Sequence, residues 1–426
     1  MFSKHYSLHS ARQNLSRLAS GTVLSQILLL ASTPFLTRLY SPDAFGIMAI
    51  FSASYAILIP IATLKYDAAV SVTGSTYSAR YLSSLIIILI TFFSSISLVV
   101  ISLYLKISSN PKFDVNFFYL PLALWLGGVY TIFQQWSARR CDYNIFSKAL
   151  VCGGVVNVST SLLLGYIFEG NEFGIIIGFL SGLLCSVLYI AFNEDLIYIN
   201  VFDFKTKNIR NLFKYLIIYS RFPRVVLPTA LLLCISQSIL PIVIQYFYTN
   251  NDVGQFSVAN RLLLIPSALI GAAIAETFKS EFLLRLRQKK QATPILMKTL
   301  FGLLVVAVPL FLVLSLISPI LFRWIFGENY FNSGYIARSM AIGVAVQFVV
   351  MPFSSIFIAL RQERIGLLIQ FTTTLIPIIV LVIASIAGLV IENALFFYSL
   401  SNFFMFFIML RIIFSISKTY DKEKFR

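Results

Sequence analysis

The chain has 426 residues, of which 58% are hydrophobic and only 12% are charged, and its formal net charge is +16. Its mean hydropathy of +0.86 is too high for a water-soluble domain of this length. Basic loops on the cytoplasmic side of a membrane explain the positive charge, so it does not indicate nucleic acid binding. The composition therefore predicts a polytopic membrane protein.

Long apolar runs follow one another along the chain, and each can cross a hydrocarbon layer about 30 Å thick. We predict an all-α fold with twelve transmembrane helices, near residues 18–39, 44–64, 81–105, 115–138, 145–168, 173–193, 222–248, 253–276, 295–322, 337–360, 365–390 and 393–416. The first run leads directly into a turn and a second span. We therefore interpret it as a retained helix and not as a signal peptide.

A short motif between the first two runs recurs 208 positions later, between the seventh and eighth runs. Its residues are Tyr40, Ser41, Phe45 and Gly46 in the first copy and Tyr248, Thr249, Val253 and Gly254 in the second. A proline follows each copy, Pro60 in the first and Pro266 in the second, with a slip of two residues. The chain therefore reads as two related halves, an arrangement typical of membrane transporters.

The repeat and the loop charges predict the domain organisation and the orientation. If the N-terminus is cytoplasmic, the inside segments hold 27 of the 33 lysine and arginine residues, as the positive-inside rule requires. Both termini are then cytoplasmic, because the number of spans is even. We predict an N-terminal lobe with helices one to six at 1–200, a cytoplasmic linker at 201–221, a C-terminal lobe with helices seven to twelve at 222–416, and a cytoplasmic tail at 417–426.

Several sequence features of enzymes are missing from the chain. The predicted outer loops are short, and no DxD, HExxH, GxSxG or GxxxxGK[ST] pattern occurs. The four cysteines have no CxxC spacing, so neither a disulfide framework nor a metal site follows. We predict a secondary transporter that is not an enzyme and has no cofactor, and we leave open whether H⁺, Na⁺ or no ion couples transport.

Three arginines are candidate substrate-binding cations. Arg261 lies about 12 Å into the eighth run, too deep for a loop residue. It either reaches the outer interface or a backbone carbonyl, or it lines a central cavity, and we favour the cavity. Arg38, near the outer end of the first run, is an interface anchor, a partner for Asp43 or a cavity residue. Arg17, at the inner end of that run, serves topology or attracts an anionic substrate.

Further residues are candidates for gating, ion coupling or helix bending. Lys65 and Asp67 form either a buried pair that holds a gate or a boundary pair that sets topology. Glu276 is a polar group near the end of the eighth run, and it contacts either neighbouring helices or the substrate. Prolines inside the runs each remove a helix hydrogen bond, and the predicted bends lie at Pro34, Pro60, Pro241 and Pro266.

The opening segment carries a recognisable pattern. It consists of Asn14-Leu15, Ser20-Gly21, the run from Leu36 to Pro42, Phe45-Gly46 and the run from Leu64 to Asp67. The pattern resembles the polysaccharide exporter family of the multidrug/oligosaccharidyl-lipid/polysaccharide exporter superfamily, and in particular its Wzx-type O-antigen flippases. The strong match covers roughly residues 14–70, and the remainder agrees in the number of spans, the duplication and the loop lengths.

The resemblance implies a function, a location and partners. It implies a flippase that moves an undecaprenyl-pyrophosphate-linked oligosaccharide, the repeat unit of O-antigen in lipopolysaccharide or of a related surface polysaccharide, from the cytoplasmic to the periplasmic leaflet. Two pseudo-symmetric lobes of the MATE-like type would give alternating access in a bacterial cell inner membrane. Arg261, and less securely Arg17 and Arg38, would meet the pyrophosphate. Membrane lipids, a polysaccharide polymerase and a chain-length regulator are candidate partners.

Two other functions stay open on the sequence. An ion-coupled multidrug or cation antiporter of the same superfamily would need carboxylates inside the spans, whereas the interior candidates here are mainly basic. A membrane-embedded polysaccharide polymerase or ligase would need a large outer loop, which the predicted topology does not provide. The twelve predicted spans also lack the extra C-terminal pair of the lipid II flippases, so that relative is less favoured.

Overall fold

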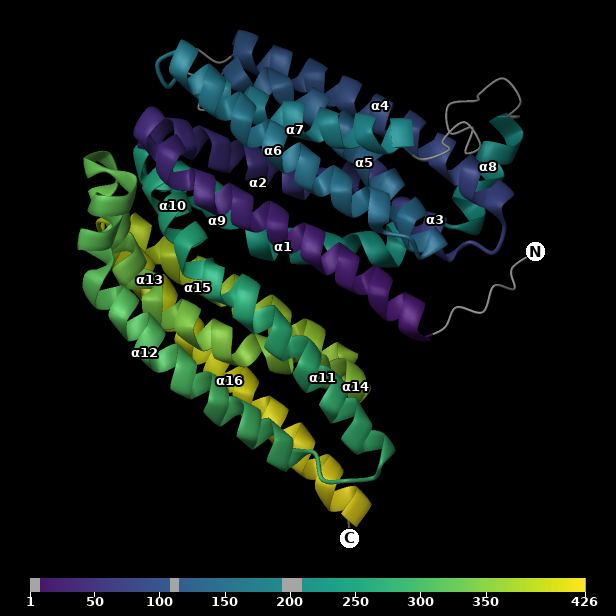
Figure 1. Ribbon diagram of the computed structural model, residues 1–426, viewed down its shortest axis with the longest axis vertical. Coiled ribbons are helices and arrows are strands. Elements are labelled where there is room, and N and C mark those ends of the chain that lie inside the picture. Colours follow the sequence, from purple (N-terminus) through teal and green to yellow (C-terminus); the bar gives the residue numbers. More distant parts are fainter. Residues whose placement is uncertain (1–7, 108–114, 194–208, 426) are drawn as a thin grey trace. The chain divides into compact units, whose positions relative to one another are not determined.

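The computed structural model describes residues 8–107, 115–193 and 209–425, and within these ranges it contains helices and no strand (Figure 1). This confirms the predicted all-α fold class. The chain divides into two compact units, Met1–Ile242 and Val243–Arg426, and the division falls inside one helix just after Pro241. The four predicted domain ranges stay a prediction.

The N-terminal unit holds both long helices and short segments. They are α1 (Leu8–Leu39), α2 (Pro42–Thr63), α3 (Asp67–Val72), α4 (Thr76–Ile107), the 3-10 segment η1 (Val115–Tyr119), α5 (Leu120–Arg140), α6 (Asn144–Ile167), α7 (Glu172–Asn193), α8 (Ile209–Ile218), the π-helical turn η3 (Phe222–Val226) and most of α9 (Leu227–Phe247). Within the unit, α6 lies against both α7 and α1, and α5 lies against α2, α3, α4 and α7.

The C-terminal unit begins at the end of α9. Its elements are α10 (Asn250–Pro266), the π-helical turn η4 (Ser267–Gly271), α11 (Ala272–Arg287), α12 (Thr293–Phe326), the 3-10 segment η5 (Glu328–Tyr330), α13 (Phe331–Val350), the 3-10 segment η6 (Met351–Ser354), α14 (Ser355–Ala359), α15 (Glu363–Ile386) and α16 (Ile391–Phe425). In this unit α13 packs against α10, α12 and α16, and α15 packs against α16.

Small residues allow α6 and α7 to pack closely. A Cβ atom placed on Gly153 in α6 would lie only 2.7 Å from the carbonyl oxygen of Gly182 in α7, closer than real Cβ contacts. Ser186 of α7 also donates a hydrogen bond to the Ala149 carbonyl across the same contact. Close backbone approach of this kind is how helices associate in lipid, where the hydrophobic effect does not drive them together.

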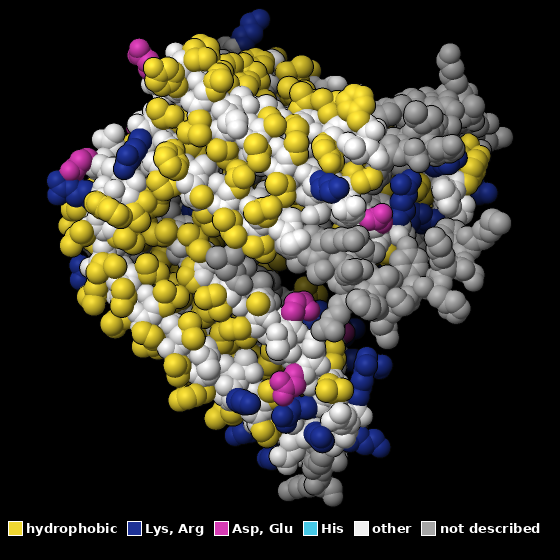
Figure 2. All heavy atoms as spheres, viewed as in Figure 1, with side chains coloured by type: hydrophobic (Ala, Val, Ile, Leu, Met, Phe, Trp, Pro, Cys, Tyr) yellow, Lys and Arg dark blue, Asp and Glu magenta, His cyan; other side chains and the backbone are white. Residues whose placement is uncertain are grey.

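Eleven helical segments in the described ranges are long and apolar enough to cross a membrane, and they match all the predicted spans except 253–276. The residues of that span form α10, η4 and the start of α11, and this crossing stays a prediction. Hydrophobic side chains cover much of the surface seen in Figure 2. Phe92, Phe301 and Trp324 are among the exposed large side chains, as expected for contact with lipid.

Two segments outside the predicted spans are helical. Between the predicted spans 253–276 and 295–322, α11 continues to Arg287. Phe278 and Phe282 are buried one turn apart, and Glu281 pairs with Arg285 at 3.4 Å, which supports the helix here. In the same way α16 continues to Phe425, through residues expected to form the C-terminal tail. Hydropathy identifies the membrane spans, and it does not report where an amphipathic helix continues beyond the membrane.

The short helix α8 occupies part of the predicted linker and packs on the N-terminal unit. The Tyr66 hydroxyl donates to the Leu216 carbonyl at 3.0 Å, and the Tyr215 ring stacks on Tyr81 with centroids 5.4 Å apart. Burial raises the pKa of Tyr66, and the nearby positive charge of Arg224 lowers it by a smaller amount. The phenol therefore keeps the proton that it donates to the Leu216 carbonyl. The linker residues at 209–218 are therefore fixed to this unit, which the sequence did not predict.

Candidate functional site

The repeated motif forms two helix N-termini. Ser41 is the N-cap of α2, where its hydroxyl accepts from the Ala44 amide at 3.3 Å. Thr249 is the N-cap of α10, where it accepts from the Asp252 amide at 3.3 Å while Asp252 accepts from the Thr249 amide at 3.1 Å. The sequence repeat is thus a structural repeat, because each copy satisfies backbone amides that a helix start leaves unpaired.

The repeated tyrosines anchor the two turns in the same way. The Tyr40 hydroxyl donates to the Ser161 carbonyl of α6 at 2.6 Å, and the side chain is only 1% exposed. The Tyr248 hydroxyl donates to the Leu389 carbonyl between α15 and α16 at 2.9 Å. In each copy, the tyrosine hydrogen bond connects the turn to a segment more than 100 residues later in the same unit. This bond helps to fix the position of the helix that follows the turn.

The helices that follow the two turns end differently. In the first copy α2 stops at Thr63, three residues after Pro60, and the next two residues adopt left-handed backbone conformations with φ of 47° at Leu64 and 56° at Lys65. A left-handed residue with a side chain costs about 1–2 kcal/mol, so two in succession need support from their surroundings.

Asp67 supplies that support. Its carboxylate is 2% exposed, accepts from the Thr63 hydroxyl at 3.0 Å and lies 3.2 Å from the Lys65 ammonium, which is 26% exposed. The Lys65 amide also donates to the Thr63 hydroxyl oxygen at 3.3 Å. The structure thus brings the predicted Lys65 and Asp67 together around a sharp chain reversal. Whether the pair acts as a gate stays a prediction.

In the second copy the helix continues past the equivalent point, and it carries Arg261. This residue lies eleven positions after Asn250, which places it about 16 Å along α10. Its neighbours Ala259 and Leu263 are buried, whereas the Arg261 side chain is exposed. The Arg261 side chain therefore lies on an exposed face of α10, and its depth in a membrane stays a prediction together with the crossing of this segment. Its role in binding stays a prediction.

A π-helical turn follows Pro266. Proline has no amide proton, so the Leu262 carbonyl cannot receive its usual helical hydrogen bond, and the five residues Ser267–Gly271 widen into a π-helix before α11 begins. The Ser267 hydroxyl is buried and has no hydrogen-bond partner among the residues that the structure describes. Of the four predicted bends, Pro266 is the one followed directly by a change of helix type.

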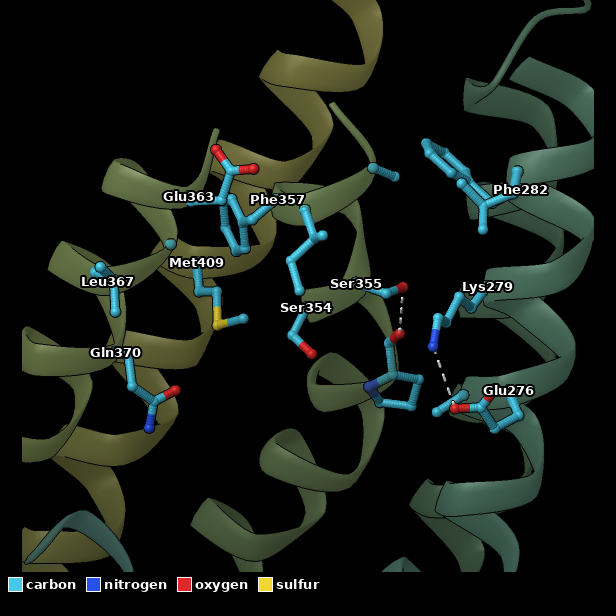
Figure 3. Close-up of a pocket in the computed structure, with 16 residues that line it drawn as sticks. Glu276, Lys279, Phe282, Ser354, Ser355, Phe357, Glu363, Leu367, Gln370 and Met409 are labelled. Carbon is cyan, nitrogen blue, oxygen red and sulfur yellow. Dashed lines mark hydrogen bonds and ion pairs between the residues drawn. The ribbon is translucent and has the colours of Figure 1, made fainter. Parts of the chain in front are cut away.

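A cavity of about 600 Å³ lies in the C-terminal unit beside Glu276. Figure 3 shows Glu276, Lys279 and Phe282 of α11 on one wall, Glu363, Leu367 and Gln370 of α15 with Met409 of α16 opposite, and Ser354, Ser355 and Phe357 between them. Glu276 and Lys279 lie 3.5 Å apart and are 75% and 50% exposed. A pair this exposed contributes less than about 1 kcal/mol, so both groups remain available to a ligand.

A second cavity of about 220 Å³ adjoins the first. The two share Ala275 and Pro352, and the smaller is lined by Ser267 and Gln347. The Ser267 hydroxyl, which has no partner among the described residues, and the amide of Gln347 are polar groups of this smaller cavity. Ser267 belongs to the π-helical turn, so this cavity lies beside that turn. The C-terminal unit thus presents carboxylates, amides and hydroxyls next to apolar side chains, a lining that suits a ligand with hydroxyl groups and an apolar face.

The remaining predicted residues lie where the sequence placed them along their helices. Arg38 is in the last turn of α1 and its side chain is exposed, and Pro34 lies one turn earlier. Pro241 lies inside α9. Arg17 also lies in α1, but its side chain is outside the described part of the structure. The substrate and gating roles of these residues stay predictions.

Sequence reasoning missed most of the cavity lining. Ser354 and Ser355 follow Pro352 near the end of a candidate span, and Gln370 lies in an otherwise apolar helix. A polar side chain inside an apolar run was the available signal, but in sequence it is indistinguishable from an ordinary helix contact. Arg139 was also missed: it donates to the Val70 and Thr73 carbonyls and so caps α3.

No group of three or more histidine, cysteine, aspartate or glutamate residues that could hold a metal ion occurs in the part of the chain that the structure describes. Two carboxylates at the candidate loci have lysine partners, Asp67 with Lys65 and Glu276 with Lys279. Either carboxylate remains a candidate for coupling to an ion, and the identity of such an ion stays open.

Sequence comparison finds one protein family. The sequence profile of the family described as "Polysaccharide biosynthesis protein" matches residues 35–334. This range includes both repeated turns, the Lys65 and Asp67 pair, Arg261 and Glu276. A comparison with curated proteins gave no match.

Solved structures with a similar fold are membrane transporters. An inward-facing multidrug resistance MATE family transporter of the MOP superfamily aligns with a TM-score of 0.70 at 16% identity, over 93% of this chain and 96% of that one. The lipid II flippase MurJ in an inward closed conformation aligns with a TM-score of 0.70 at 15% identity, over 96% and 90%. A MOP superfamily transporter from Pyrococcus furiosus aligns with a TM-score of 0.58 at 13% identity, over 96% of each chain. These identities establish a shared fold.

Proposed function

Because the chain belongs to the polysaccharide biosynthesis protein family, we propose that it is a flippase for a lipid-linked oligosaccharide. The proposed cargo is an undecaprenyl-pyrophosphate-linked repeat unit of O-antigen or a related surface polysaccharide. It moves from the cytoplasmic to the periplasmic leaflet of a bacterial inner membrane by alternating access. The relatives with this fold are transporters and a flippase, not enzymes.

One observation supports the proposal most directly: an exposed arginine lies about 16 Å along α10, the helix that begins the predicted eighth span. Placing a cation at this depth is costly, so such residues face water, protein or an anionic ligand. A guanidinium presents a planar set of donors that matches phosphate oxygens, and the low-dielectric surroundings strengthen the attraction. Arg261 is thus suited to hold the pyrophosphate of the cargo.

The cavity beside Glu276 supports the glycan part of the proposal. Carboxylates and amides such as Glu363 and Gln370 can accept and donate hydrogen bonds to sugar hydroxyls, and the exposed side chain of Leu367 can contact the apolar face of a sugar. With a volume of about 600 Å³ the cavity has room for a small saccharide. The polyprenyl tail can remain in lipid while the polar head group crosses, because only the head group needs a polar path.

A second candidate function is an ion-coupled multidrug or cation antiporter of the same superfamily. Glu276 and Glu363 are two carboxylates on one cavity, and such groups attract protons or organic cations. If this were the function, removal of the chain would increase sensitivity to cationic drugs and leave surface glycan unchanged.

The experiment that separates these functions is deletion of the gene followed by localisation of lipid-linked repeat units. In spheroplasts of the deletion strain we expect these units to accumulate and to be protected from a membrane-impermeant oxidant, because they stay on the cytoplasmic leaflet. Reintroduction of the wild-type chain should restore surface glycan. Accumulation of units that the oxidant reaches would instead assign the chain to a later polymerase or ligase step.

A further inference from the structure

A groove in the C-terminal unit is separate from the cavity beside Glu276. It has a volume of about 500 Å³, and its walls come from α12, α13 and α16. All three helices belong to segments long and apolar enough to cross a membrane. The walls include Val308, Leu312, Leu316 and Ile342, each between 42% and 62% exposed. The groove is therefore an open apolar channel at membrane depth.

The groove is lined by one face of α12 and one face of α13. On α13 the lining residues Arg338, Ile342 and Ala345 recur every three or four positions, and on α12 the residues Leu312 and Leu316 do the same. Since a short turn joins α12 to α13, the two helices run in opposite directions. The end of the groove that holds Arg338 is therefore the end nearer to that turn.

Arg338 is the one charged residue of this lining, and no carboxylate accompanies it. Its side chain is exposed, it lies seven residues after Phe331, or about 10 Å along α13, and no ion pair or hydrogen bond to it is found among the described residues. The hydroxyls of Ser315 and Ser339 line the same groove. A cation in this position needs an anion, because an isolated charge in hydrocarbon is strongly disfavoured.

We propose that this groove binds an anionic phospholipid of the surrounding membrane, with the phosphate on Arg338 and an acyl chain along the groove. The geometry matches the orientation of a lipid, since the charged end lies toward the α12–α13 turn and the apolar end runs toward the middle of the spans. The serine hydroxyls donate to phosphate or glycerol oxygens, and the exposed leucines and isoleucine contact the acyl chain. This site is separate from the proposed cargo path.

The test is a lipid titration of the purified full-length chain in detergent, followed by native mass spectrometry. We expect phosphatidylglycerol to bind the wild-type chain, and Arg338→Gln to weaken that binding about tenfold or more, the loss expected for a hydrogen bond between charged groups. The matched control is Arg323→Gln, because Arg323 is exposed, lies at the end of α12 outside the groove lining and pairs with Glu328. This control should bind phosphatidylglycerol like the wild type.

A second variant tests the apolar part of the groove with Arg338 intact. Leu312 is 57% exposed, so Leu312→Trp adds bulk to the groove without disturbing a packed core. We expect this variant to keep its thermal midpoint and to lose the bound lipid. Unchanged binding in either groove variant, or an equal loss in Arg323→Gln, would overturn the proposal, because recognition would then not depend on this groove.

Discussion

The two copies of the repeated turn are alike where they begin a helix and different where that helix ends. Both have a hydroxyl N-cap and a tyrosine that donates to a distant carbonyl, at 2.6 Å from Tyr40 and at 2.9 Å from Tyr248. After the turns, α2 stops at a left-handed reversal held by Asp67, whereas α10 carries Arg261 and continues through a π-helical turn to Arg287.

The difference separates the scaffold from the candidate site. The shared features are those that a duplicated fold needs in order to place a helix, and side chains that satisfy backbone groups are interchangeable between copies. The first copy alone has the reversal held by Asp67. The second copy alone has an exposed arginine and a helix that changes type beside a cavity. Such departures from regular helix geometry occur frequently at functional sites. We therefore expect substitutions in the shared part and at the Asp67 reversal to change stability, and substitutions at Arg261 to change transport.

The largest expected effect is that of Arg261→Ala. If Arg261 holds the pyrophosphate, its removal should reduce surface glycan about tenfold or more while the protein remains in the membrane at its normal abundance. Arg261→Lys keeps the charge and loses the paired donors, so it should retain part of the activity. The measurement is surface glycan by immunoblot against protein abundance, with Arg323→Gln as the control. Normal glycan in Arg261→Ala would remove this residue from the mechanism.

The next effect concerns the end of α2. Lys65→Met leaves the buried Asp67 carboxylate with the Thr63 hydroxyl and no cation, and it should lower stability by up to about 3 kcal/mol. Asp67→Asn should cost less, since it removes the charge and keeps a side-chain oxygen for Thr63. Thermal unfolding of the purified chain in detergent would give both values. An equal midpoint for both variants and the wild type would show that the ion pair does not hold the reversal.

A smaller effect is expected at the repeated tyrosines. Tyr40→Phe leaves the buried Ser161 carbonyl without its donor and should cost about 1–3 kcal/mol. Tyr248→Phe should cost less, because Tyr248 is less buried than Tyr40. Both variants should still transport cargo when the temperature is low enough for them to remain folded. Loss of transport by a fully folded Tyr248→Phe protein would contradict the assignment of this turn to the scaffold.

The N-caps are expected to have the smallest effects. Thr249→Ala should lower stability by about 1 kcal/mol, and Ser41→Ala by somewhat less, because only the second copy has the reciprocal bond from Asp252. Comparison of the two thermal midpoints checks this order. A larger loss in Ser41→Ala would show that the first turn depends on its cap more than the hydrogen bonds indicate.

The fold was predictable from the sequence to the extent that hydropathy and periodicity determine it. The repeated turn at Tyr40 and Tyr248 and the spans matched by α1, α2 and α12 follow from apolar length and turn residues. The π-helical turn after Pro266 was not predictable, because a proline permits several local outcomes and packing selects one of them. The helix α8 was also missed, since ten residues are too few to stand out from a polar linker.

The candidate site was predictable only in part. Arg261 stood out because a charge inside an apolar run is rare, and the pair of Lys65 and Asp67 stood out because two charges flank one residue. Gln370 and Ser354 did not stand out, because single polar residues in membrane helices usually bond to their own or a neighbouring helix. Their common position on one cavity depends on how α11, α14, α15 and α16 pack, and this is a tertiary property.

Transport of a lipid-linked oligosaccharide by the purified chain is the measurement that tests the proposal most directly. Proteoliposomes would carry an undecaprenyl-pyrophosphate-linked saccharide in both leaflets, and a membrane-impermeant oxidant would modify the sugars that face outward. With the wild-type chain we predict that nearly all of the saccharide is modified over time, because the inner pool is moved outward as the outer pool is consumed. With Arg261→Ala, and in liposomes without protein, about half should remain protected. Equal protection with the wild-type chain and without protein would contradict the proposed flippase function.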